Sequence, residues 1–106
     1  EHFGQIFVST TKPGITRGNH YHDTKVEKFC VIKGRAIVRF RHVLGQDVIE
    51  YAVSDKPIVV VDIPPGYAHS IENVGDDDMV VLFWASERFD PTRPDTTFVE
   101  VLCDKN

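Results

Sequence analysis

Short runs of alternating hydrophobic and polar residues recur along the chain, and turn residues separate them. No run shows the period of an amphipathic helix, so we predict an all-β fold. Such a series of short strands indicates a sandwich, a barrel or a jelly roll. The strands are expected at 3–9, 17–22, 27–32, 36–43, 48–53, 58–63, 68–73, 79–86 and 98–102.

Two of these regions predict a more specific arrangement. The runs 36–43 and 48–53 flank Gly45 and predict a hairpin. The run 58–63 is almost wholly apolar, as expected for a strand that is buried on both faces. The turn at 64–66, Pro-Pro-Gly, ends this run.

The composition is ordinary for a globular protein and narrows the possible functions. Hydrophobic residues make up 42% of the 106 residues, charged residues make up 26%, and the formal net charge is −4. We therefore expect a single domain over residues 1–106. Nucleic acid is not an expected partner because no basic patch stands out. No membrane contact is expected, since no apolar run is long enough to cross a bilayer.

The chain begins with Glu-His-Phe-Gly at 1–4, without Met and without a secretory signal. We expect it to be a piece of a longer protein or a processed chain. Of the two cysteines, Cys30 lies in an apolar run and is predicted to be a buried free thiol. A disulfide to Cys103 stays open, although a reducing cytoplasm is the expected location.

Three histidines and one glutamate form the most informative pattern in the chain. His20 and His22 are one residue apart, Glu27 follows them, and His69 comes after the turn at 64–66. Three imidazoles and a carboxylate are a ligand set for a divalent transition metal. Residues two apart in a strand face the same side, so His20 and His22 present both rings to one face. We expect Glu27 to start the next strand beside this pair, after a bend, and a coordination position to stay open for substrate.

Other polar residues have simpler explanations. His2 and His42 are expected to be ordinary polar residues. The guanidiniums of 35, 39 and 41 lie on one face of a strand and could hold a diphosphate. Pairing across strands with Glu50 is the favoured explanation. Trp84 is expected in the core or at a subunit contact.

The spacing of the histidines and the glutamate resembles the two motifs of the cupin superfamily. The first motif fits in full over 14–34. The second fits over 64–73, except that Ile58 stands where its first glycine is usual. The resemblance implies a small cupin β-barrel, a jelly roll or double-stranded β-helix. In cupins a divalent metal is bound at the positions filled here by His20, His22, Glu27 and His69.

Longer strings narrow the resemblance. Segments 17–22 (RGNHYH), 62–67 (DIPPGY) and 82–85 (LFWA) are similar to the C-terminal cupin domain of bifunctional capsular-polysaccharide-assembling enzymes. In those enzymes a zinc cupin is credited with C3 epimerisation of a UDP-linked N-acetylated 4-keto-6-deoxyhexose. A short-chain dehydrogenase domain reduces the keto sugar with NADPH. The resemblance thus implies a zinc-dependent nucleotide-sugar epimerase that acts on a UDP-sugar, with the reductase domain preceding residue 1. No dinucleotide fingerprint occurs here, so we expect no NADPH binding by this chain.

Epimerisation needs a base to remove the C3 proton and an acid to return one. Lys25 lies in the bend between the predicted ligands, and Tyr67 lies two residues before His69. Both are candidate catalytic residues. A solvated turn residue and a packing aromatic ring are the alternative explanations for these two positions.

Two other functions stay open for this sequence. The ligand set also suits iron, and a cupin that binds iron here would be an oxygenase. Alternatively, the barrel is non-catalytic and binds sugar or serves for dimerisation. Cupins often pair through a strand edge or a sheet, so a homodimer is expected in either case.

Overall fold

The computed structural model describes residues 5–22, 27–85, 96–98 and 101. Every regular element in this part of the chain is a β-strand, which confirms the all-β prediction, and none of it is a helix able to span a membrane. The strands are β1 (Gln5–Thr11), β2 (Thr16–His22), β3 (Glu27–Lys33), β4 (Arg35–His42), β5 (Ile49–Ser54), β6 (Val61–Ile63), β7 (Tyr67–Asn73), β8 (Met79–Ala85) and β9 (Thr96–Phe98).

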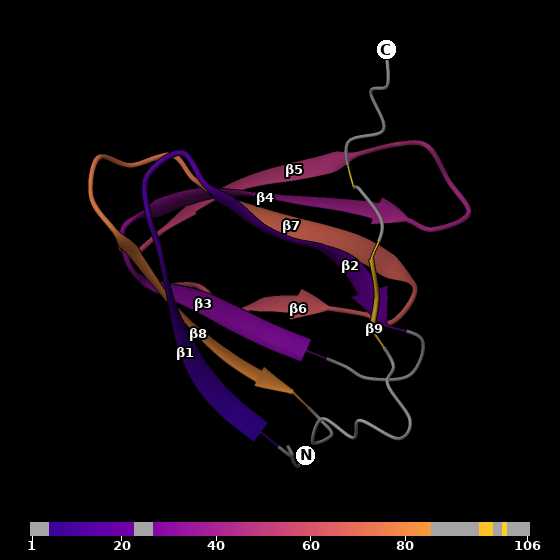
Figure 1. Cartoon of the computed structure of the whole chain (residues 1–106), viewed down its shortest axis with the longest axis horizontal. Coiled ribbons are helices and arrows are strands. Elements are labelled where there is room, and N and C mark those ends of the chain that lie inside the picture. The colour runs from indigo at the N-terminus through magenta and orange to yellow at the C-terminus, as the bar shows by residue number, and fades with distance from the viewer. Residues whose placement is uncertain (1–4, 23–26, 86–95, 99–100, 102–106) are drawn as a thin grey trace.

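The strands form two antiparallel sheets that lie as two layers (Figure 1). One sheet has the order β1-β8-β3-β6, and the other has the order β5-β4-β7-β2-β9. Strands that follow each other in the sequence can lie in opposite sheets, as β2 and β3 do, and β6 and β7. The chain therefore crosses between the layers, as it does in a jelly roll.

Alternate residues along the strands build the core between the sheets. On β4, Val38 and Phe40 are buried, and they belong to the same apolar cluster as Phe29 of β3 and Val81 of β8. Arg39 lies between them in sequence and points to the other face of its sheet, where it pairs with acidic residues. This period of two is the pattern from which the strands were predicted.

Seven of the predicted strands are confirmed to within two residues at each end. The hairpin around Gly45 is also confirmed, since β4 and β5 pair antiparallel. Of the last predicted strand, 98–102, only Phe98 is a described strand residue, at the end of the observed strand Thr96–Phe98, and Val101 is not in a strand. Residues 99–100 and 102 lie outside the described part of the chain.

The prediction of a strand over 58–63 that is buried on both faces is wrong. Only Val61–Ile63 is a strand, and Ile58, Val59 and Val60 are 50%, 43% and 55% exposed. The physical reason is the position of β6 at the edge of its sheet, where its described pairing is with β3. Of the apolar residues that precede it, Ile58 forms only isolated bridges, with Ser54 and Asp55, and Val59 and Val60 belong to no strand in the described structure.

Asn73 fastens one end of the barrel. Its side chain is fully buried, and its Nδ2 donates to the carbonyl oxygens of Thr11 and Asp77, each at 2.9 Å. Its Oδ1 accepts from the backbone amide of Gly75 at 2.9 Å. One side chain thus connects the end of β7 to the end of β1 and to the turn before β8.

We predict that Asn73→Ala lowers the free energy of unfolding by about 3 kcal/mol, because one buried and two partly buried hydrogen bonds to the backbone are lost. Urea denaturation followed by circular dichroism measures this loss. Asp76→Ala alters an exposed residue of the same turn and is expected to change stability by about 0.5 kcal/mol or less. Equal losses in the two variants would contradict the role of Asn73.

Candidate functional site

A histidine and a glutamate from opposite sheets meet inside the barrel. His69 lies on β7, Glu27 begins β3, and His69 Nε2 is 3.7 Å from Glu27 Oε1. The side chains are only 8% and 10% exposed. Glu27 does start the next strand, as predicted, and that strand lies in the sheet opposite to β2. Two of the four predicted ligands are thus brought together by the packing of one sheet on the other.

The surroundings of His69 determine which ring nitrogen faces Glu27. His69 Nδ1 lies 3.4 Å from the carbonyl oxygen of Tyr67, which can only accept a hydrogen bond, so Nδ1 is the donor in this contact. In the neutral ring, Nε2 then carries a lone pair next to a carboxylate oxygen. A shared proton or a shared metal ion between these two atoms would stabilise the buried pair.

The separation of the two atoms also fits a metal ion. Two donors about 2.1 Å from one tetrahedral ion lie about 3.4 Å apart. The observed distance between Nε2 and Oε1 is 3.7 Å, longer than an ordinary hydrogen bond. A small inward shift of either side chain therefore brings both within bonding distance of one ion.

The backbone of β2 brings a third predicted ligand next to this pair. His20 is the partner of His69 in the register between β2 and β7. His22 lies two residues further along β2, opposite Thr96 of β9. The structure does not describe the side chains of His20 and His22, and among the side chains that it does describe no group of three or more metal-binding residues gathers. The four-ligand site therefore stays a prediction.

Of the two predicted catalytic residues, only Tyr67 can be located. It lies two residues before His69 on β7, and therefore on the same face of the strand. Its ring is half-buried and packs edge-on against His42, with ring centroids 5.0 Å apart. Lys25 lies outside the described residues, so its role stays a prediction.

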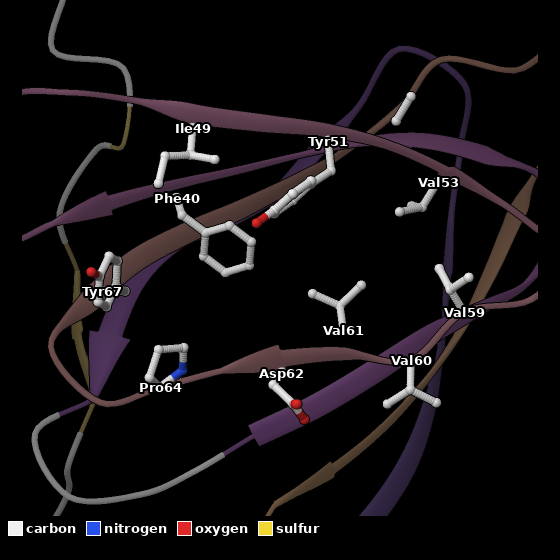
Figure 2. Close-up of a pocket in the computed structure, with 11 residues that line it drawn as sticks. Phe40, Ile49, Tyr51, Val53, Val59, Val60, Val61, Asp62, Pro64 and Tyr67 are labelled. Atoms are coloured by element: carbon white, nitrogen blue, oxygen red, sulfur yellow. The ribbon is translucent and has the colours of Figure 1, made fainter.

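A pocket of about 580 Å³ opens between β5 and β6 (Figure 2), and neither His69 nor Glu27 is among its lining residues. Phe40 and Tyr67 line it, and Phe40 is the partner of His69 in the register between β4 and β7. This volume is typical of a small-molecule site. The lining residues are Phe40, Ile49, Tyr51, Ala52, Val53, Val59, Val60, Val61, Asp62, Pro64 and Tyr67.

The aromatic and apolar wall of this pocket was missed by sequence reasoning. The available signal was the apolar run 58–63, whose exposed Val59 and Val60 line the pocket. Tyr51 of β5 lies in the same sheet as Phe40 of β4, opposite the sheet that contains β6. Its ring packs edge-on against the ring of Phe40, with centroids 5.9 Å apart. Figure 2 shows the Phe40 and Tyr51 rings next to each other on one side of the pocket, with Val61 on the other side.

Two of the three arginines of β4, Arg39 and Arg41, have hydrogen-bond partners in the structure. Arg39 Nε lies 2.7 Å from Glu50, which confirms the expected cross-strand pairing, and Arg39 Nη1 lies 2.9 Å from Glu72. The hydrogen bond to Glu50 raises the pKa of Arg39. Arg41 donates hydrogen bonds to the carbonyl oxygens of Val101 and Gly45. Arg39 is thus engaged by two carboxylates, and it is not among the residues that line the pocket.

Three further residues can be compared with expectation. Cys30 is buried and free, as predicted, and burial raises the pKa of its thiol. His42 is exposed, and its Nδ1 accepts a hydrogen bond from the Leu44 amide at 3.2 Å, which fits an ordinary polar residue. Trp84 is partly buried on β8.

Known proteins resemble this chain over nearly its whole length. Residues 1–97 match the polysaccharide biosynthesis C-terminal domain. The chain belongs to this family. It is 48% identical over 93 residues to the UDP-2-acetamido-2,6-beta-L-arabino-hexul-4-ose reductase of Pseudomonas aeruginosa, a match that covers 88% of this chain and 25% of that protein. It is 27% identical over 101 residues to the spore coat polysaccharide biosynthesis protein SpsL of Bacillus subtilis, which covers 90% of this chain and 66% of SpsL.

Solved structures agree with this assignment. The capsular polysaccharide assembling protein CapF of Staphylococcus aureus superposes with a TM-score of 0.91 at 56% identity, over 94% of this chain and 29% of CapF. CapF has also been solved with the inhibitor 3-isopropenyl-tropolone. The 4-keto-6-deoxy sugar epimerase NovW of Streptomyces spheroides shares the fold, with a TM-score of 0.77 at 16% identity, over 86% of this chain and 49% of NovW. The predicted cupin barrel and family resemblance are confirmed, although the chain spans only 25% and 29% of the Pseudomonas protein and of CapF.

Proposed function

We propose that this chain is the metal-binding cupin domain of a capsular polysaccharide biosynthesis enzyme. We propose further that it catalyses C3 epimerisation of a UDP-linked N-acetylated 4-keto-6-deoxyhexose. The observation that carries the proposal is the buried approach of His69 and Glu27. A pocket large enough for a sugar is lined by Phe40, the register partner of His69, and by Tyr67, two residues before His69. The likeness to CapF supports the polysaccharide context, and the UDP-2-acetamido hexul-4-ose of the Pseudomonas relative supports the substrate class.

The inhibitor of CapF also supports a metal in this family. A tropolone carries a carbonyl oxygen and a hydroxyl oxygen on neighbouring carbons, a pair of hard donors suited to a divalent cation. Zinc is the metal that we propose, held by His20, His22, Glu27 and His69. Iron together with oxygen consumption would favour a cupin oxygenase instead.

The chemistry of the proposed reaction suits the described residues. A divalent ion supplies Lewis acidity toward the C4 carbonyl oxygen, which makes the neighbouring C3 proton easier to remove. Tyr67 lines the pocket and lies on the same face of β7 as His69, which supports the proposal that its hydroxyl transfers a proton at C3. A second group must serve the opposite face of the sugar, and Lys25 is the candidate. Phe40 and Val61 give the pocket an apolar wall.

The proposal includes a partner domain in the full-length protein. The Pseudomonas relative is a reductase, and this chain spans 25% of it. A short-chain dehydrogenase domain that uses NADPH is the proposed neighbour, acting on the epimerised keto sugar. A homodimer located in the cytoplasm completes the proposal.

His69→Ala is predicted to abolish both metal binding and C3 chemistry, because it removes a buried ligand. Metal per chain, measured by plasma mass spectrometry after dialysis, should fall at least about 10-fold. Deuterium incorporation at C3 of the UDP-keto sugar, followed by proton NMR, should become undetectable.

The control for this experiment is His42→Ala, which removes an exposed imidazole that is not one of the predicted ligands. It is expected to retain the wild-type metal content. If His69→Ala kept its metal, the assigned ligand set would be wrong. If it lost its metal but still exchanged deuterium at the wild-type rate, the metal would have no part in the chemistry.

Tyr67→Phe is predicted to lower the rate of C3 deuterium exchange by about 100-fold while the metal content stays unchanged, because only a hydroxyl is removed. The comparison variant is Lys25→Met, measured with the same substrate and the same NMR assay. Full exchange in Tyr67→Phe together with no exchange in Lys25→Met would assign the base to Lys25 and reject Tyr67.

A further inference from the structure

Strand β2 contains one more residue than its partner β7 over the same stretch. Thr16 and Gly18 pair with Glu72 and Ser70 in regular order, but the next pair joins His20 to His69. Asn19 is therefore an extra residue and forms a β-bulge.

The bulge changes which residues of β2 occupy the inner positions of the barrel. Residues alternate between the two faces of a strand, and the partner of His69 occupies an inner position. In a regular strand that partner would be Asn19, and His20 and His22 would take outer positions. The extra residue moves the His-x-His pair into the inner register.

We infer that Gly18 is a positioning residue for the metal site, an inference that rests on the proposed function. Gly18 has φ of +102°, a backbone conformation that other residues rarely adopt. A Cβ atom on Gly18 would lie 2.8 Å from the carbonyl oxygen of His69 and 3.1 Å from the Cα of Ser70. Both are backbone atoms of β7 and cannot rotate away, so any side chain here pushes β2 off the strand that carries His69.

Gly14 is a matched comparison within the same region. It also has a positive φ, of +80°, but a Cβ atom placed on it would meet nothing within 4 Å. An alanine at Gly14 therefore adds only backbone strain. An alanine at Gly18 adds similar strain and also a collision with the ligand-bearing strand.

The test is a Co²⁺ titration of the full-length protein, read by the visible absorption of the bound ion. The absorption reports the ligand geometry, which a general loss of stability does not alter. Gly18→Ala is expected to weaken Co²⁺ binding at least about 10-fold and to change the spectrum. Gly14→Ala is expected to keep the wild-type spectrum, and circular dichroism establishes that each variant is folded.

A second variant combines Gly18→Ala with deletion of Asn19. Without the extra residue, a regular strand places His20 opposite His69 and needs no positive φ, so Co²⁺ binding and the wild-type spectrum should return. This variant decides the question even if Gly18→Ala alone does not fold. A double variant that is unfolded, or folded but unable to bind Co²⁺, would overturn the inference, as would equal effects of Gly14→Ala and Gly18→Ala. Absence of Co²⁺ binding by the wild-type protein would instead remove the proposed metal site, and this inference with it.

Discussion

His69 and Glu27 approach each other from opposite sheets, so their 3.7 Å separation depends on how the two layers pack. On the inner face of β7, His69 lies between Ile71, which belongs to the apolar core, and Tyr67, which lines the pocket. On β3, the residue two positions after Glu27 is the fully buried Phe29. The apolar core thus packs next to the pair on the side of Ile71 and Phe29, and the pocket lies on the side of Tyr67. A shared cation, either a proton or the proposed metal ion, would stabilise a buried pair of this kind.

The residues of the family motifs divide into those that supply chemistry and those that supply geometry. Asn73, at the end of the second motif, has no chemical role in this account. Its three hydrogen bonds fasten β7 to β1 and to the next turn, and so set the position of the strand that carries His69. Gly18 lies inside the first motif but is not one of its defining positions. Its contact with the backbone of β7 nevertheless makes it the glycine most closely tied to the proposed site.

The strand positions could be predicted because inward and outward residues alternate along most of them, as in β4. The candidate ligands could be predicted because their types and spacing are rare in combination. The exposure of residues 58–60 could not be predicted, because an apolar run does not reveal whether a neighbouring strand covers it. The bulge at Asn19 could not be predicted either, because an extra residue can be recognised only when the strand is aligned with its partner strand. For the same reason, nothing in the sequence placed Glu27 in the sheet opposite to β2.

The central claim is that one divalent ion is shared by imidazoles and a carboxylate at the point where the two sheets meet. X-ray absorption at the zinc edge of the zinc-loaded full-length protein tests this most directly. The account predicts a coordination shell of about three imidazole nitrogens at about 2.0–2.1 Å and one carboxylate oxygen at about 2.0–2.2 Å. A sulfur shell at about 2.3 Å, or zinc bound by water oxygens alone, would contradict it.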